Sequence, residues 1–290
     1  MSCRLTILAS GSSGNCACIE TDTTRLLVDA GLSGKQIEER LTSIRLNIED
    51  FNGILVTHEH SDHVQGLRVM ASRYRIPIFA NRATREAVLA TAELQSPTAA
   101  GKAGALDWRL FESGQRFAVG DFDVEPFTIP HDAADPVGFL IHHGDRHVVF
   151  LTDLGHTTHL ALDRAKQADT LILETNHDLK LLQDDPHRPW SVKQRIGGRH
   201  GHLSNEAAAA ALAEIMSDQL KHVYLSHLSQ DCNRPQLAEA TIRKKLKELG
   251  ATHVRVTVAS PHKPCPTEVL EPARTLKMET LPLFGQAVAP

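Results

Sequence analysis

The chain of 290 residues contains no long apolar run and no segment that resembles an export signal. No stretch approaches the roughly 18 consecutive apolar residues that a membrane-spanning helix requires. The opening residues, MSCRLTILAS, lack both a cationic leader and a long apolar segment, so no secretory signal is visible. These absences predict a cytoplasmic protein with no membrane partner.

Paired cysteines are also lacking. None of the five cysteines stands in a C-x-x-C arrangement of the kind that binds structural zinc, and we expect reduced thiols at Cys3, Cys16, Cys18, Cys232 and Cys265. A large excess of charge is missing too, because the formal net charge is −4 and the pI is near 6.5. This balance argues against a protein that grips nucleic acid by bulk electrostatics alone, although a local basic patch is compatible with it.

Histidine, by contrast, is abundant, with 17 copies, and the densest group lies in the stretch LVTHEHSDHVQGL. His58 and His60 alternate along an extended segment and so point the same way, and the following turn presents Asp62 and His63. Imidazole nitrogen together with carboxylate oxygen suits zinc, manganese or iron, whereas magnesium and calcium prefer oxygen alone. The spacing therefore predicts a metal site, and a polar surface loop is the less favoured alternative.

Three further apolar β runs each end at one potential ligand. The segments FTIPHDA, VVFLTDLG and VYLSHLS place His131, Asp153 and His227 just beyond a predicted strand. A lone histidine at a strand end is more often an ordinary polar residue, so each signal is weak by itself. Together with the histidine-rich box, they predict four strand ends that converge on one rim.

The order of predicted elements indicates two sheets. Strands and helices alternate through the first hundred residues and again from 156 to 259, while the segment from 108 to 151 reads as an antiparallel meander. A helix from Arg234 to Leu249 is bounded by Pro235 and Gly250. Two sheet-rich halves flanked by helices predict an α/β fold with the sheets face to face and the helices outside.

The ligand residues resemble those of the metallo-β-lactamase superfamily, in which an H-x-H-x-D-H box is followed by a later His, Asp and His. The resemblance implies an αββα four-layer sandwich, a single domain over residues 1–260 and a proline-rich tail or arm over 261–290. It also implies a dinuclear site with two divalent ions, Zn²⁺ or Mn²⁺. One ion would be held by His58, His60 and His131, the other by Asp62, His63 and His227, with Asp153 bridging.

Several other motifs are similar to the YycJ-like branch of that superfamily, also called WalJ or VicX. They are ASGSSGN, VDAGLSGKQIEERL, IPHDAADPVGF, ETNHD and GHLSN. The resemblance implies a metal-dependent nuclease with 5′ to 3′ exonuclease activity on duplex DNA. Two cations about 3.5–4 Å apart can share a hydroxide, which lowers the pKa of water and provides the nucleophile.

Candidate residues for substrate binding are less specific. The glycine-rich loop with Ser12, Ser13 and Asn15 could offer groups to an anion, although tight-turn chemistry explains it nearly as well. His202 and Ser204 could contact a scissile phosphate or protonate a leaving oxygen, but Ser204 also stands where the N-cap of a helix belongs. Asn176 and His177 follow a strand and are second-tier candidates for the same cleft. We expect Asp62, Asp153 and His202 to be catalytic.

A basic segment, RPWSVKQRIGGRHGH, contains no acidic residue between Arg188 and His202. Its cations, including Lys193, Arg195 and Arg199, together with Trp190 suit a nucleic-acid strand through phosphate contacts and stacking. A solvated helical face explains the segment about equally well. Glu59 and Thr57 are candidates to orient the ligand histidines.

The tail carries a short apolar motif. Thr280–Phe284, with the sequence TLPLF, resembles the peptides that dock on the bacterial sliding clamp, with Thr where glutamine is usual. The alternative is a tail that packs its leucines and phenylalanine on its own domain. Clamp binding that depends on Leu283 and Phe284 would decide between them.

The main functional hypothesis is a dinuclear metallohydrolase that cleaves DNA. The histidine-rich box determines how water is activated but does not determine the substrate. The alternative is therefore an enzyme that hydrolyses a small ester, lactone, thioester or cyclic nucleotide. An iron redox protein is less favoured, because a diiron oxidoreductase of this fold would commonly have glutamate where His60 stands. A non-catalytic regulatory partner is disfavoured because every expected ligand is present.

Overall fold

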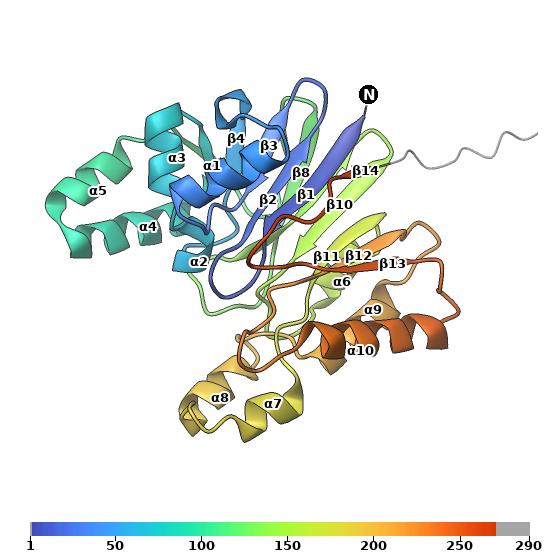
Figure 1. The fold of residues 1–290 in the computed structure, drawn as a ribbon. Coiled ribbons are helices and arrows are strands. Elements are labelled where there is room, and N and C mark those ends of the chain that lie inside the picture. The colour runs from blue at the N-terminus through green and yellow to red at the C-terminus, as the bar shows by residue number, and fades with distance from the viewer. Residues whose placement is uncertain (1, 271–290) are drawn as a thin grey trace, which may run out of the picture.

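The computed structural model describes residues 2 to 270, which form two seven-stranded sheets packed face to face (Figure 1). The first sheet contains β1 (Cys3–Ala9), β2 (Cys16–Glu20), β3 (Arg25–Val28), β4 (Gly53–Leu55), β5 (Ile78–Asn81), β6 (Trp108–Phe111) and β14 (Glu268–Leu270). Their order is β14-β1-β2-β3-β4-β5-β6. Pairing is antiparallel from β14 to β3 and parallel from β3 to β6.

The second sheet contains β7 (Phe117–Val119), β8 (Phe122–Thr128), β9 (Val137–His143), β10 (Arg146–Leu151), β11 (Thr170–Glu174), β12 (His222–Ser226) and β13 (Arg255–Val258). Their order is β13-β12-β11-β10-β9-β8-β7. Strands β7 to β10 form an antiparallel meander and β10 to β13 are parallel. The parallel strands β11 and β12 are buried along their whole length, because helices cover one face and the first sheet covers the other.

Helices complete the outer layers. Those on the side of the first sheet are α1 (Gly34–Ser43), α2 (Ser61–Val64), α3 (Leu67–Tyr74), α4 (Arg82–Gln95) and α5 (Pro97–Gly104). Those on the side of the second are α6 (His159–Ala165), α7 (Leu179–Asp184), α8 (Trp190–Ile196), α9 (Asn205–Ile215) and α10 (Pro235–Glu248), and a short 3₁₀ turn covers Ile48–Asp50. Apolar cores lie between the sheets and under each helical layer, which gives the predicted αββα sandwich.

The structure corrects the predicted meander at one end. Strand β6 was expected to join the following strands, but it pairs in parallel with β5 at the edge of the first sheet. The chain then crosses to the second sheet, and only β7 to β10 form the meander. Helix α5 was not predicted. The predicted helices over 156–168 and 204–220 are shorter, and α10 lies within one residue of its predicted ends.

The segment after residue 260 also differs from the expected arm over the part that the structure describes. Cys265 is buried and its backbone N–H donates to the carbonyl oxygen of Ile7, and β14 extends the first sheet by pairing with β1. Residues 261 to 270 therefore belong to the sandwich. The clamp-like motif Thr280–Phe284 lies outside the described residues. Within residues 2 to 270, no helix is both long enough and apolar enough to span a bilayer.

Candidate metal centre

The histidine-rich box lies in the connection between β4 and α2. His58 follows β4 after two residues, His60 is the N-cap of α2, and Asp62 and His63 lie in its first turn. The backbone of this turn is tied to the loops after β1 and β3, because the N–H of Asn15 donates to the carbonyl oxygen of Asp62 and the N–H of Ala30 to that of His63, each at 2.8 Å. These bonds hold the turn in place without using the ligand side chains.

A glycine permits this close approach. A Cβ on Gly31 would lie 1.7 Å from the carbonyl oxygen of Asp62, so no larger residue fits without moving one of the two loops. Gly31 also donates its N–H to the carbonyl oxygen of Asn15 at 2.9 Å. The loop after β3 is therefore part of the support of the site.

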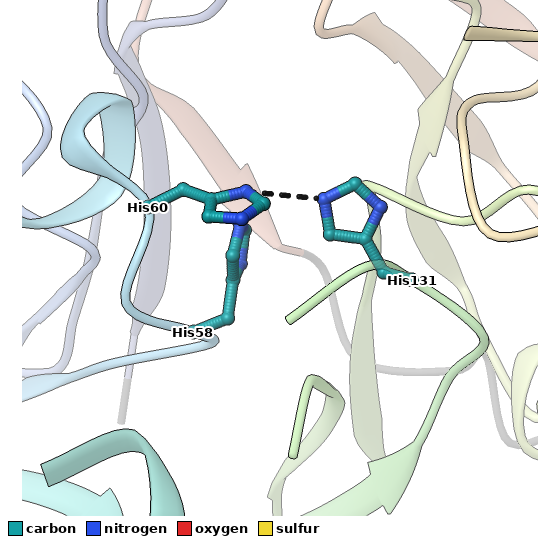
Figure 2. Close-up of side chains that lie close together, drawn as sticks. All are labelled: His58, His60 and His131. Carbon is teal, nitrogen blue, oxygen red and sulfur yellow. Dashed lines mark hydrogen bonds between the residues drawn. The ribbon is translucent and has the colours of Figure 1, made fainter. Parts of the chain in front are cut away.

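Three histidines form a first cluster, shown in Figure 2. Ligand atoms of His58, His60 and His131 lie within 4.8 Å of one another, and Nδ1 of His60 is 3.3 Å from Nε2 of His131. His131 comes from the second sheet, three residues after β8, whereas the other two follow β4 in the first sheet. The predicted ligand set of one ion is therefore brought together from both sheets.

A second cluster contains Asp62, His63 and His227, whose ligand atoms also lie within 4.8 Å of one another. Nε2 of His227 is 3.0 Å from Oδ2 of Asp62, and Nε2 of His63 is 3.6 Å from the same oxygen. His227 follows β12 directly, at the expected strand end. The structure thus also brings together the predicted ligand set of the second ion.

Asp153 lies between the clusters. Its Oδ2 is 3.3 Å from Nε2 of His63, its Oδ1 is 3.3 Å from Nε2 of His227, and it also groups with His58. This is the position that a bridging carboxylate requires. Asp153 and His227 have left-handed backbones with φ of 58° and 55°, as does Asp29 with 61°. Such backbones are uncommon for these residues and turn the side chains at the strand ends.

The residues present fit divalent ions. Nε2 of His58 and Oδ2 of Asp153 are buried and have no hydrogen-bond partner among the described residues. Buried polar atoms are normally paired, and two orphaned atoms in one group of ligands have their simplest explanation in a bound cation. The mixture of imidazole and carboxylate suits zinc, manganese or iron.

Three of the candidate ligand histidines have an oxygen near Nδ1. Nδ1 of His58 lies 3.0 Å from Oγ1 of Thr57, Nδ1 of His63 lies 2.7 Å from Oδ2 of Asp29, and Nδ1 of His131 lies 3.1 Å from the carbonyl oxygen of Gly201. An N–H donated from Nδ1 leaves the lone pair of Nε2 for a metal. Thr57 was a predicted partner. Glu59 instead accepts from the backbone N–H of Ala134.

Glu174 is the carboxylate behind the second cluster. It is completely buried, accepts from Nδ1 of His202 at 2.7 Å and lies 3.2 Å from Nδ1 of His227. Its other oxygen accepts from the backbone N–H groups of Leu154 and Leu203. Neither Glu174 nor Asp29 was among the predicted site residues. The available signal was an acidic residue that closes an otherwise apolar strand.

Charge in the centre is set by burial and by neighbouring side chains. Burial and the nearby imidazole of His63 hold the pKa of His58 well below its usual value. Burial alone would raise the pKa of Asp153, but His227 and His63 hold it well below the usual range. For Glu174, burial is likewise opposed by His202, and its pKa falls to about 2. His58 is therefore neutral and both carboxylates are ionised. Burial would lower the pKa of His227, but the carboxylate of Asp153 raises it to about 10, so an ion at the second cluster would bind with release of a proton.

His202 lies at the edge of the two clusters. Its ring centroid is 5.1 Å from those of both His131 and His227, and 22 % of its side chain is exposed. Because Glu174 holds its Nδ1, its Nε2 remains for a group outside the protein. His202 is thus the predicted catalytic residue that the structure leaves accessible beside the metal ligands.

Three residues that were predicted to bind substrate make hydrogen bonds within the protein. Asn15 is buried and its side chain accepts from Gly11 N–H and the Ser10 hydroxyl while its amide nitrogen is 3.1 Å from Nε2 of His63. Asn176 is buried and donates to the carbonyl oxygen of His227 at 2.9 Å. Ser204 caps α9 by accepting from the N–H of Ala207. These bonds hold the loops around the two clusters, and substrate binding by the three residues stays a prediction.

The remaining candidates are divided between surface and interior. Ser12 and Ser13 are exposed on the loop after β1, and Arg199 is exposed, with its guanidinium 3.2 Å from Nε2 of His156. His177 is 1 % exposed, which corrects the expectation that it faces the cleft. The basic segment is partly neutralised by acids from elsewhere in the chain: Arg188 pairs with Asp185 and Asp231, and Arg195 pairs with Asp132.

Comparison with known proteins gives the same family. The model of the beta-lactamase superfamily domain matches residues 24–228. The chain is 40 % identical over 250 residues to the exodeoxyribonuclease YycJ of Bacillus anthracis, an alignment covering 86 % of this chain and 91 % of the relative. It is 38 % identical over 245 residues to the exodeoxyribonuclease WalJ of Streptococcus pneumoniae, covering 84 % and 88 %.

Solved structures share the fold at low identity. The metallo-beta-lactamase fold protein YhfI of Bacillus subtilis superposes with a TM-score of 0.66 at 15 % identity, over 91 % of this chain and 99 % of that one. Zn²⁺-bound PqqB of Methylobacterium extorquens gives 0.64 at 18 % identity, over 90 % and 99 %. The αββα sandwich, the two ligand clusters and the similarity to these relatives agree. The chain belongs to the beta-lactamase superfamily and, within it, to the family of YycJ and WalJ.

Proposed function

We propose that this protein is a metal-dependent phosphodiesterase that removes nucleotides from DNA, beginning at a 5′ end, with two divalent ions, Zn²⁺ or Mn²⁺. The observation that carries the proposal is the pair of ligand clusters that share Asp153, with His202 accessible beside them. The names of the relatives, which are exodeoxyribonucleases, support DNA as the substrate. Such a substrate is consistent with the expected cytoplasmic location.

The ligand side chains define where the reaction would occur. When bound, a pair of divalent ions lowers the pKa of water and neutralises charge that develops on phosphate oxygens. His58, His60 and His131 would hold one ion, Asp62, His63 and His227 the other, and Asp153 would contact both. Asp29 and Glu174 keep their imidazoles fixed, so little reorganisation is required when substrate arrives.

His202 supplies the remaining protein group. Its Nδ1–H is donated to Glu174, which fixes the ring and leaves Nε2 as the nitrogen that can bond to substrate. From there Nε2 can bond to an oxygen of the phosphate or to the departing oxygen. His202 therefore positions the phosphate beside the ligands, and its loss should reduce turnover more than it reduces metal content.

Digestion of duplex DNA labelled at either the 5′ or the 3′ end tests the proposal. With Mn²⁺ or Zn²⁺ present, we expect early release of the 5′ label as mononucleotides, and no release by Asp62→Ala or His63→Ala variants that retain the fold. Full activity in either variant would contradict the two-metal assignment. Turnover of small esters or lactones without any cleavage of DNA would instead favour the alternative substrate class.

A further inference from the structure

The hairpin formed by α7 and α8 projects from the sandwich below the second sheet (Figure 1). Between the two helices lies an open cavity of about 530 Å³, lined by Leu179, Leu182, Trp190, Lys193 and Gly197, among others. The cavity is separate from the metal ligands, none of which lines it. Its walls combine aliphatic side chains, one indole and one cation.

Trp190 is unusual for its exposure. Its side chain is among the largest in the chain, and the residue is 66 % exposed, beside Leu179 with 54 %. The other tryptophan, Trp108, is partly buried and donates its indole N–H to the carbonyl oxygen of Ala103. An exposed indole beside an exposed leucine forms an apolar surface, and the hydration of such a surface is unfavourable. Exposed apolar surfaces of this kind often mark binding sites.

The hairpin is basic in an acidic protein. Residues 179 to 202 contain five lysines and arginines and two aspartates, a formal charge of +3, whereas the whole chain has −4. Lys193 lines the cavity and its ammonium donates to the carbonyl oxygen of Gln183 at 2.6 Å. Cationic surface with an accessible aromatic face is the combination that binds single-stranded nucleic acid, since phosphates meet the cations and bases stack on the ring.

Helix α8 connects this cavity to the metal centre. Arg195, five residues after Trp190, pairs with Oδ2 of Asp132 at 2.5 Å, and Oδ1 of Asp132 is 3.5 Å from Nε2 of His131. The helix is roughly 9 Å long at 1.5 Å per residue, and Trp190 stands at the end away from Arg195. A strand bound at the metal ligands therefore has to extend beyond its terminal nucleotide to reach the ring of Trp190.

We propose that the α7–α8 cavity holds a single-stranded segment of the nucleic-acid substrate, with one base stacked on Trp190. The inference rests on the proposed nuclease function and adds to it a second, non-catalytic contact on the strand outside the metal centre. The strand is held by its phosphates near Lys193 and by stacking, without sequence preference. Substrate affinity therefore increases once the strand is long enough to reach the ring.

Kinetics of metal-loaded Trp190→Ala on oligothymidylates of two to ten nucleotides test this. We expect the ratio of KM for the ten-nucleotide substrate to KM for the dinucleotide to rise about tenfold or more, as loss of one base stack implies. Trp190→Phe keeps an aromatic face and should restore most of the length dependence. Leu94→Ala removes an even more exposed apolar side chain, on α4, and should leave the ratio unchanged.

Direct binding separates this inference from the proposed function. Because the chain has two tryptophans, Trp108→Phe makes Trp190 the sole tryptophan, and phosphorothioate oligothymidylate should quench its fluorescence when tryptophan is excited selectively. Quenching with the expected length threshold supports the inference. Normal DNA digestion by Trp190→Ala with an unchanged KM ratio, or no quenching, would overturn it. Failure of the unmodified protein to digest any DNA would overturn the proposed function instead.

Discussion

Glu174 accepts a hydrogen bond from Nδ1 of His202 at 2.7 Å and lies 3.2 Å from Nδ1 of His227. One buried carboxylate thus orients an imidazole that would bind metal and another that faces the substrate. Two backbone N–H groups, from Leu154 and Leu203, hold the carboxylate itself. The second cluster and His202 are consequently coupled through one buried carboxylate.

Glu174→Gln should lower metal affinity by about 10- to 100-fold, because an amide accepts less strongly and cannot serve both imidazoles. Competition with a chelating dye measures this affinity, and kcat and its pH profile report the effect on His202. Glu206→Gln, an exposed glutamate in the first turn of α9, is the matched control. Unchanged affinity together with an unchanged pH profile would show that Glu174 is only a packing residue.

His131→Ala should reduce the bound metal from about two ions per chain to about one, because only the first cluster loses a ligand. Plasma emission spectrometry after dialysis measures the ratio. His159→Ala removes an exposed histidine at the start of α6 and should leave the ratio intact. A ratio that stays at its original value in His131→Ala would refute the assignment of that cluster.

Removal of metal should destabilise the fold. The ligand atoms within each cluster lie within 4.8 Å of one another. An ion that binds only the native state at a hundredfold excess over Kd adds about 2.7 kcal/mol to the free energy of unfolding. For a chain of this size we expect Tm to fall by roughly 5–10 °C with chelator. Calorimetry with and without chelator, followed by restoration with Zn²⁺ or Mn²⁺, is the measurement. A Tm indifferent to chelator would argue against resident ions.

Gly31→Ala should destabilise the protein by at least ~2 kcal/mol and lower metal content, because its methyl group would overlap the carbonyl of Asp62. Urea unfolding gives the change in free energy. Gly101→Ala is the control, since a Cβ there meets nothing within 4 Å and the residue lies in α5, so it should be neutral or stabilising by roughly 0.5–1 kcal/mol. Equal effects of the two substitutions would contradict the role given to Gly31.

Much of the centre was predictable because ligands follow strands. An apolar run that ends in His or Asp is visible in the sequence, and the ends of neighbouring strands meet at one rim, so His131, Asp153 and His227 could be assigned together. The residues that support the ligands could not be predicted in this way. The bond between Asp29 and His63, for example, joins residues 34 positions apart in the sequence and depends on how their two loops meet. The same limit applies to Asn176, whose orientation toward His227 no local pattern indicates.

The fold was predictable to the same extent. Helix boundaries were predicted accurately where the sequence has strong start and stop signals, as with Pro235 and Gly250 around α10. They failed where a short strand can join either sheet: β6 has ordinary β composition, and only its pairing with β5 assigns it to the first sheet. Strand β14 was missed because its three residues lie among prolines and gain their order from β1.

Each cluster takes two side chains from the connection after β4 and the third from the opposite sheet. Neither half of the chain can therefore assemble a complete coordination sphere by itself. A cation at either cluster would therefore bind only after the two halves have packed together. Once bound at this rim, it would join side chains of both halves and oppose their separation.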